Sequence, residues 1–140
     1  MSAEPVVWSI AGLDSGGGAG LSADQRAADA VGVHLCPVAA ALTAQSSRSV
    51  EAVFPVPVEQ LQAQLDALAT DLPPAVIKTG LLGSAAQLAV VTRFVDELRR
   101  QHPVALVVDP VLRASTGAAL ADDALLRAYR DELLPRATVA

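Results

Sequence analysis

The stretch Ile10-Ala11-Gly12-Leu13-Asp14-Ser15-Gly16-Gly17-Gly18-Ala19-Gly20 decides the fold of this chain. Four of the nine glycines fall within the last five residues of the stretch. An apolar run that begins at Val6 leads into it and predicts a buried strand, and residues 21–28 have the composition of a helix. We therefore expect a strand, a glycine-rich turn and a helix at the start of the chain.

Four glycines within five residues at the end of a strand favour a ligand site over a simple tight turn. Glycine lets the backbone approach a ligand closely, and the following helix offers unpaired N–H groups and the positive end of its dipole.

Three common motifs are excluded by the sequence. A phosphate-binding P-loop needs a lysine next to the glycines, but Lys78 is the only lysine; the dinucleotide motif fails at Leu21; and a hydrolase elbow would need serine in place of Asp14.

Composition limits the class of protein. The 140 residues suit one small domain, and with 52% hydrophobic but only 3% aromatic residues the core must consist of Ala, Val and Leu. A net charge of −5 argues against nucleic acid or an anionic membrane as a partner. No apolar run approaches the ~18 residues of a membrane span. The single cysteine and the absence of a signal-peptide pattern predict a cytoplasmic protein.

Helical and strand-like segments alternate along the rest of the chain. Pro37 interrupts the second apolar run, so we expect its start to be irregular or to lie at an edge, with a secure strand at 38–42. Further strands are predicted at 50–56, 75–79 and 104–108, with a strand-like start at 137–140. Helices are predicted at 58–72, after Ser84 and at 120–133. A Ser/Thr/Gly loop is predicted at 114–117. Short, continuously apolar strands between helices indicate a doubly wound α/β domain with a mostly parallel sheet and helices on both faces.

Polar or glycine-rich residues follow four of the predicted strands, at 12–20, 43–45, 78–80 and 109–110. Ligands of such sheets bind outside the carboxyl ends of the strands, so these clusters should converge on one site.

The individual side chains leave alternatives open. Gln45 can read the edge of a heteroaromatic ring or can be a loop residue bonded to backbone. Asp24, which we expect just inside a helix N-terminus, is explained by the helix dipole or by a bond to a ligand hydroxyl. Asp109 can hold Mg²⁺ through water or cap the turn after it. Lys78 can meet a phosphate, although a single surface lysine usually has no role.

Four other reactive side chains lack the partners that catalysis needs. We expect them to be structural: Ser15, His34, Cys36 and His102.

The ordered motifs resemble those of a known family. Residues 11–24, 41–45, 78–83, 108–111 and 133–139 are similar, in the same order and at similar spacing, to segments of hydroxymethylpyrimidine/phosphomethylpyrimidine kinases, which are ribokinase-like enzymes of thiamine biosynthesis. The resemblance implies ATP- and Mg²⁺-dependent phosphorylation of 4-amino-5-hydroxymethyl-2-methylpyrimidine and then of its monophosphate.

The resemblance also implies roles for particular residues. The pyrimidine pocket would be lined by Gly12, Asp24, Thr43, Gln45, Leu81 and Val111. Gln45 would read the ring nitrogen and the amino group, Asp24 would hold the hydroxymethyl group, and Asp109 would lie toward Mg²⁺ and the phosphates. No catalytic residue is expected within this chain.

Two departures from the family pattern stand out. Leu81 replaces a common methionine, which is a mild change. The family is roughly twice as long, and its second half carries the nucleotide site and an anion hole. We therefore interpret residues 1–140 as the N-terminal portion of one kinase domain, with the C-terminal part of the fold missing and no activity alone.

The complete protein is expected to form a homodimer. The alternatives are a pyridoxal-type kinase and a non-catalytic pyrimidine-binding module.

Overall fold

A five-stranded sheet lies at the centre of the chain, with the strands in the order β3-β2-β1-β4-β5. The computed structural model describes residues 3–113 and 119–140, so the predicted loop at 114–117 lies outside the described residues. The strands span Val6–Leu13 (β1), His34–Gln45 (β2), Val50–Pro55 (β3), Val76–Thr79 (β4) and Ala105–Val108 (β5). All neighbouring pairs are parallel except β2 with β3, which confirms the predicted mostly parallel sheet.

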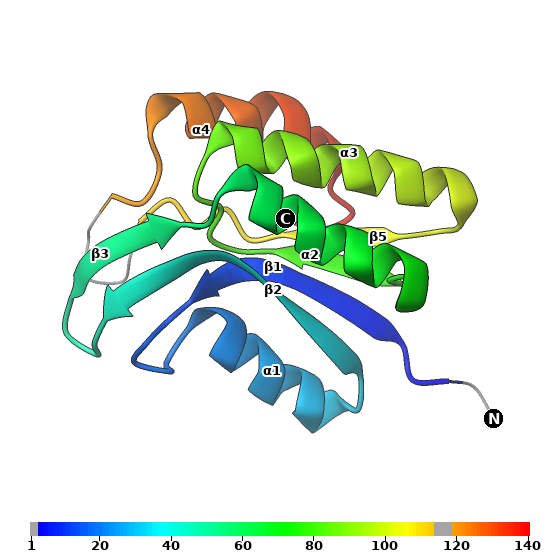
Figure 1. Cartoon of the computed structure of the whole chain (residues 1–140), viewed down its shortest axis with the longest axis horizontal. Helices are drawn as coiled ribbons and strands as arrows, with labels where there is room; N and C mark the ends of the chain where they lie inside the picture. The colour runs from blue at the N-terminus through cyan, green and yellow to red at the C-terminus, as the bar shows by residue number, and fades with distance from the viewer. Residues whose placement is uncertain (1–2, 114–118) are drawn as a thin grey trace.

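Helices cover both faces of this sheet, as the apolar character of its strands requires. Helix α1 (Gly20–Val31) packs on one face, whereas α2 (Val58–Asp71), α3 (Ala85–Gln101) and α4 (Asp123–Ala128) lie on the other (Figure 1). The core between sheet and helices contains the fully buried Trp8 of the central strand. The fold is therefore the predicted doubly wound α/β arrangement.

Strand β2 runs without interruption through Pro37. Within the part of the chain that the structure describes, its first half pairs only with β1, because β3 pairs with residues 41–45. Proline cannot donate a backbone hydrogen bond and is tolerated where no neighbouring strand needs one. Of the two expectations for this segment, the edge position is the one observed, and the irregular start is wrong. The Gln64 side chain bonds both the N–H and the C=O of Ala39 on this open edge.

The last helical segment differs from the predicted helix at 120–133. It begins at Asp123, because the Asp122 side chain accepts a hydrogen bond from the N–H of Leu125 (2.8 Å) and so caps the helix. It then widens into a π-helical turn, η1 (Tyr129–Leu133), and ends in a 3₁₀ turn, η2 (Leu134–Arg136). The strand-like end of the chain is a single parallel bridge between Val139 and Val107.

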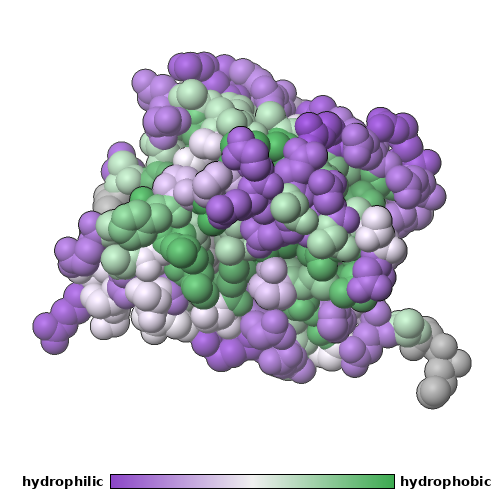
Figure 2. All heavy atoms as spheres, viewed as in Figure 1, coloured by the Kyte–Doolittle hydropathy of each residue, from purple (hydrophilic) through white to green (hydrophobic). Residues whose placement is uncertain are grey.

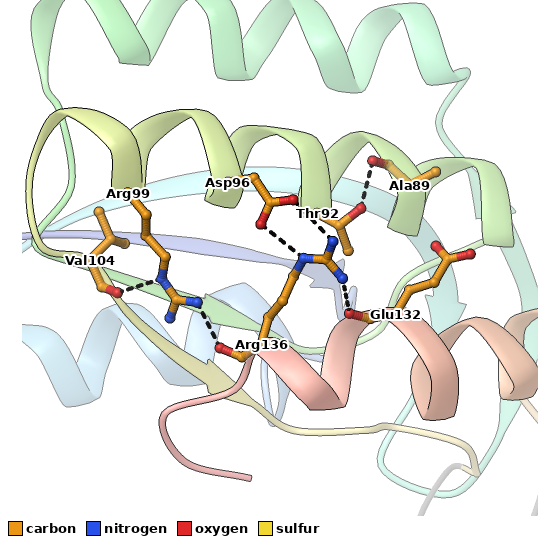
Figure 3. Close-up of polar contacts among 7 residues, drawn as sticks. All are labelled: Ala89, Thr92, Asp96, Arg99, Val104, Glu132 and Arg136. Carbon is orange, nitrogen blue, oxygen red and sulfur yellow. Dashed lines mark hydrogen bonds and ion pairs between the residues drawn. The ribbon is translucent and has the colours of Figure 1, made fainter.

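Two arginines fasten this end of the chain to α3 and to the residue just before β5 (Figure 3). Arg136 donates two hydrogen bonds to the Asp96 carboxylate, at 2.9 and 3.0 Å, and these bonds hold the pKa of Asp96 below its ordinary value. Arg99 donates to the carbonyl oxygens of Val104 (3.0 Å) and Arg136 (2.9 Å). The segment after η1 is thereby held where Val139 can reach β5.

An apolar region of the surface lies over β3, while hydrophilic side chains cover much of the helices (Figure 2). Phe54 of β3 and its cross-strand partner Leu42 are both exposed. Among the described residues, no helix is long and apolar enough to cross a membrane.

Candidate functional site

The carboxyl ends of β1, β2, β4 and β5 surround one pocket of about 420 Å³. Its wall takes residues from all four clusters that follow the predicted strands, which therefore converge as the topology requires. The residues expected at the site all line this pocket: Gly12, Asp24, Thr43, Gln45, Leu81, Asp109 and Val111.

The glycine-rich loop is organised by the buried side chain of Asp14. One carboxylate oxygen accepts the N–H of Gly16 (2.7 Å), and the other accepts the N–H groups of Gly18 and Ala19 (both 3.0 Å). Successive backbone N–H groups of this kind form a nest that binds anions, and here the anion is the chain's own carboxylate. The loop is thus a preformed wall and not an open phosphate cradle.

Sequence reasoning missed this role of Asp14, which it used only to exclude a hydrolase. The available signal was an aspartate two positions before a run of three glycines, since Asp side chains commonly bond N–H groups a few residues further on.

Two glycines allow the loop and strands to approach closely. A Cβ atom on Gly12 would lie 2.9 Å from Cδ2 of Leu81, so the two residues share one side of the pocket. Gly20 has φ +60°, and a Cβ atom there would overlap the backbone oxygen of Gly12. The first turn of α1 therefore sits directly against the end of β1.

Ser15 ties the loop to the end of β2. Its hydroxyl donates to the carbonyl oxygen of Gln45 (2.6 Å) and accepts the backbone N–H of the same residue (2.8 Å). Thr43 strengthens this junction by donating to the carbonyl oxygen of Leu13 (2.9 Å). The backbone of Gln45 is thus satisfied, whereas its side-chain amide makes no hydrogen bond within the described residues and lines the pocket.

Asp24 lies deeper in the helix than the sequence predicted. Helix α1 begins at Gly20 and has no acidic residue in its first turn, so Asp24 is in the second turn, where the helix dipole has little effect. One of its carboxylate oxygens, Oδ2, accepts the Ser9 hydroxyl (2.6 Å) and the Lys78 ammonium (2.8 Å).

Lys78 is therefore not a solvated surface lysine. Its side chain is 23% exposed and forms an ion pair with Asp24 inside the pocket. The two residues are 54 positions apart, so no local pattern in the sequence could reveal the pair.

The Asp109 carboxylate is exposed beside the pocket and makes no hydrogen bond within the described residues. Its backbone carbonyl closes the following turn by accepting the N–H of Val111 (2.9 Å). Across residues 3–113 and 119–140, no group of three or more His, Cys, Asp or Glu side chains could hold a metal ion. The Asp109 carboxylate offers a hard oxygen ligand in the wall of the pocket.

Tyr129, a residue that the sequence did not indicate, supports the pocket from behind. Its buried hydroxyl donates to the carbonyl oxygen of Gly80 (3.1 Å), directly before Leu81. Burial disfavours the phenolate and raises the pKa of Tyr129 to about 12, so this hydroxyl remains a donor at neutral pH.

A family model described as phosphomethylpyrimidine kinase matches residues 14–140. The chain belongs to this family. It is 41% identical over 136 residues to the hydroxymethylpyrimidine/phosphomethylpyrimidine kinase of Streptomyces coelicolor, covering 97% of this chain and 49% of that relative. The chain thus spans about half the length of this family member.

Solved structures agree with the family's ribokinase-like fold. A phosphomethylpyrimidine kinase from Clostridium difficile 630 superimposes with a TM-score of 0.86 at 30% identity, covering 96% of this chain and 57% of that one. The pyridoxal kinase from Staphylococcus aureus in complex with AMP-PCP and pyridoxal superimposes with a TM-score of 0.77 at 27% identity. The match covers 98% of this chain and 47% of the pyridoxal kinase chain.

Proposed function

We propose that this chain forms the substrate-binding part of an ATP-dependent kinase that phosphorylates 4-amino-5-hydroxymethyl-2-methylpyrimidine and its monophosphate. The observation that carries the proposal is the pocket at the strand ends, where the side-chain amide of Gln45 and one oxygen of Asp24 have no partner in the described residues. Membership in the phosphomethylpyrimidine kinase family supports it.

The polar groups match an aminopyrimidine. The amide of Gln45 has a donor and an acceptor, which together complement a ring nitrogen and the adjacent amino group. The Asp24 carboxylate accepts a hydrogen bond from the hydroxymethyl group. The remaining wall residues, which complete the contact with the ring, are Gly12, Thr43, Leu81 and Val111.

ATP supplies the phosphoryl group in this proposal, as AMP-PCP in the related pyridoxal kinase suggests. Mg²⁺ in such enzymes binds one or two carboxylates together with substrate phosphates, and the exposed Asp109 carboxylate fits that role. No residue of this chain is assigned to the chemical step. Because phosphoryl transfer depends on positioning and charge stabilisation, we expect turnover only when the rest of the kinase domain is present.

Isothermal titration calorimetry with the hydroxymethylpyrimidine tests the binding role. We expect saturable binding that weakens about tenfold in Gln45→Ala, because two hydrogen bonds to the ring are lost. Gln25→Ala is the matched control, since Gln25 bonds Asp29 on the outer surface of α1 and does not line the pocket. Equal affinity of Gln45→Ala and the wild type would contradict the assignment of Gln45.

A pyridoxal-type kinase is the alternative that one observation favours, because a structural relative binds pyridoxal. Comparison of kcat/KM for pyridoxal and the pyrimidine separates the two activities. A non-catalytic binding module would instead bind the pyrimidine without forming ADP. The intact mass of the cellular protein, compared with the 14.3 kDa of this chain, shows whether these assays should use this chain or a longer protein.

A homodimer and a cytoplasmic location remain predictions. Sedimentation velocity and cell fractionation test them.

A further inference from the structure

We propose that Lys78 and Ser9 are positioning residues that fix the Asp24 carboxylate and thereby give the pocket its selectivity for a ligand hydroxyl. This inference rests on the proposed function, because it needs a ligand that places a hydroxymethyl group beside Asp24.

The arrangement around Asp24 is asymmetric. The Ser9 hydroxyl and the Lys78 ammonium both bond Oδ2, at 2.6 and 2.8 Å, whereas Oδ1 has no hydrogen bond within the described residues. The carboxylate lines the pocket, so Oδ1 is the oxygen that remains for a ligand. Because both donors hold Oδ2, the orientation of the carboxylate is fixed, and Oδ1 is held in one position relative to the ligand.

Both donors are held firmly. Ser9 lies in the central strand β1 and is fully buried. The Lys78 ammonium is packed under the next turn, since a Cβ atom on Gly80 would lie only 3.0 Å from Nζ. A carboxylate held by fixed partners loses little freedom when a ligand binds, which favours affinity.

The ion pair also determines which ligand groups are accepted. A partly buried carboxylate needs a compensating charge, and the Lys78 ammonium supplies it at 2.8 Å from Oδ2 of Asp24. An ionised carboxylate only accepts hydrogen bonds, and Oδ1 therefore favours a ligand hydroxyl over a methyl group at the same position. Sites of this kind reject analogues that lack the hydroxyl because their polar group then stays unpaired.

The test compares two ligands in calorimetry: the hydroxymethylpyrimidine and the analogue with a methyl group in place of the hydroxymethyl group. We expect the wild type to prefer the hydroxymethyl ligand by at least about tenfold. In Lys78→Met and Ser9→Ala this preference should fall severalfold, while affinity for the methyl analogue stays unchanged. Lys78→Arg should restore part of the preference. Arg130→Met is the control, because Arg130 forms an ion pair with Asp131 on the surface, away from the pocket.

Each result is decisive. Equal losses for both ligands in the variants would mean that Lys78 and Ser9 act only on stability or shape, and would overturn the inference while the proposed function stands. A wild type that binds neither ligand would overturn the proposed function and this inference with it. Thermal unfolding shows whether Lys78→Met folds; if it does not, Ser9→Ala decides, since it removes no charge.

Discussion

At the scale of single residues, Gly17 and Gly20 have the same kind of backbone but different surroundings. Both have positive φ, at +74° and +60°. A Cβ atom on Gly17 would meet nothing within 4 Å, whereas one on Gly20 would overlap the oxygen of Gly12. The first position thus needs glycine for conformation alone, and the second also needs it for space.

Alanine substitutions should separate these two requirements. Gly17→Ala should lower the free energy of unfolding by about 1 kcal/mol, the usual cost of a left-handed conformation. Gly20→Ala should lower it by more than ~3 kcal/mol, because the backbone of β1 or α1 must shift as well. Denaturant unfolding measures both values. Similar losses in the two variants would show that the contact between Gly20 and Gly12 is not rigid.

The residues of the pocket were predictable where a topological rule applies. Thr43, Gln45 and Asp109 follow predicted strands, and parallel strands bring their carboxyl ends to the same edge. The contacts between side chains were not predictable in this way. The pairing of Lys78 with Asp24 joins residues 54 positions apart, and their charges suggest a pair only once β4 is known to lie beside β1.

At the scale of elements, η1 connects the last helical segment to the pocket through Tyr129. This residue is the chain's only tyrosine, so the ultraviolet absorbance of tyrosinate reports on it alone. We expect a titration midpoint at about 12 in the folded protein, against 10.0 for an ordinary tyrosine, because burial disfavours the phenolate.

The same shift predicts a dependence of stability on pH. Above pH 10 the unfolded chain loses the phenol proton while the folded chain keeps it until about pH 12, so the free energy of unfolding should fall as the pH rises through this window. Tyr129→Phe should remove this part of the alkaline slope. A folded protein that titrates near pH 10 would contradict the burial of Tyr129.

Element types were easier to predict than their details. Apolar runs and a 3.6-residue period indicated the strands and helices correctly, because those patterns follow directly from which face is buried. The start of α4 depends on the cap bond that the N–H of Leu125 donates to the Asp122 side chain, and the π-helical turn at η1 leaves no mark in the apolar spacing. Local hydrogen bonds, and not the hydrophobic pattern, determine these boundaries.

At the scale of the whole molecule, the pocket exists only when distant parts of the chain are assembled. Its wall combines the loop after β1 with the ends of β2, β4 and β5, so it cannot form in a partly folded chain. Ligand binding should therefore stabilise the entire sheet and not one loop. Trp8, the only tryptophan, is fully buried in the central strand and reports on this sheet.

Denaturant unfolding followed by Trp8 fluorescence tests this coupling. With the hydroxymethylpyrimidine at 100 times its dissociation constant, the free energy of unfolding should rise by about 2.7 kcal/mol, since the ligand binds only the folded form. Gln45→Ala, which weakens binding but leaves the sheet intact, should show a smaller rise at the same ligand concentration. An unchanged Trp8 transition despite calorimetric binding would mean that the pocket survives when the central strand unfolds. That result would contradict an assembly in which the strands themselves hold the site together.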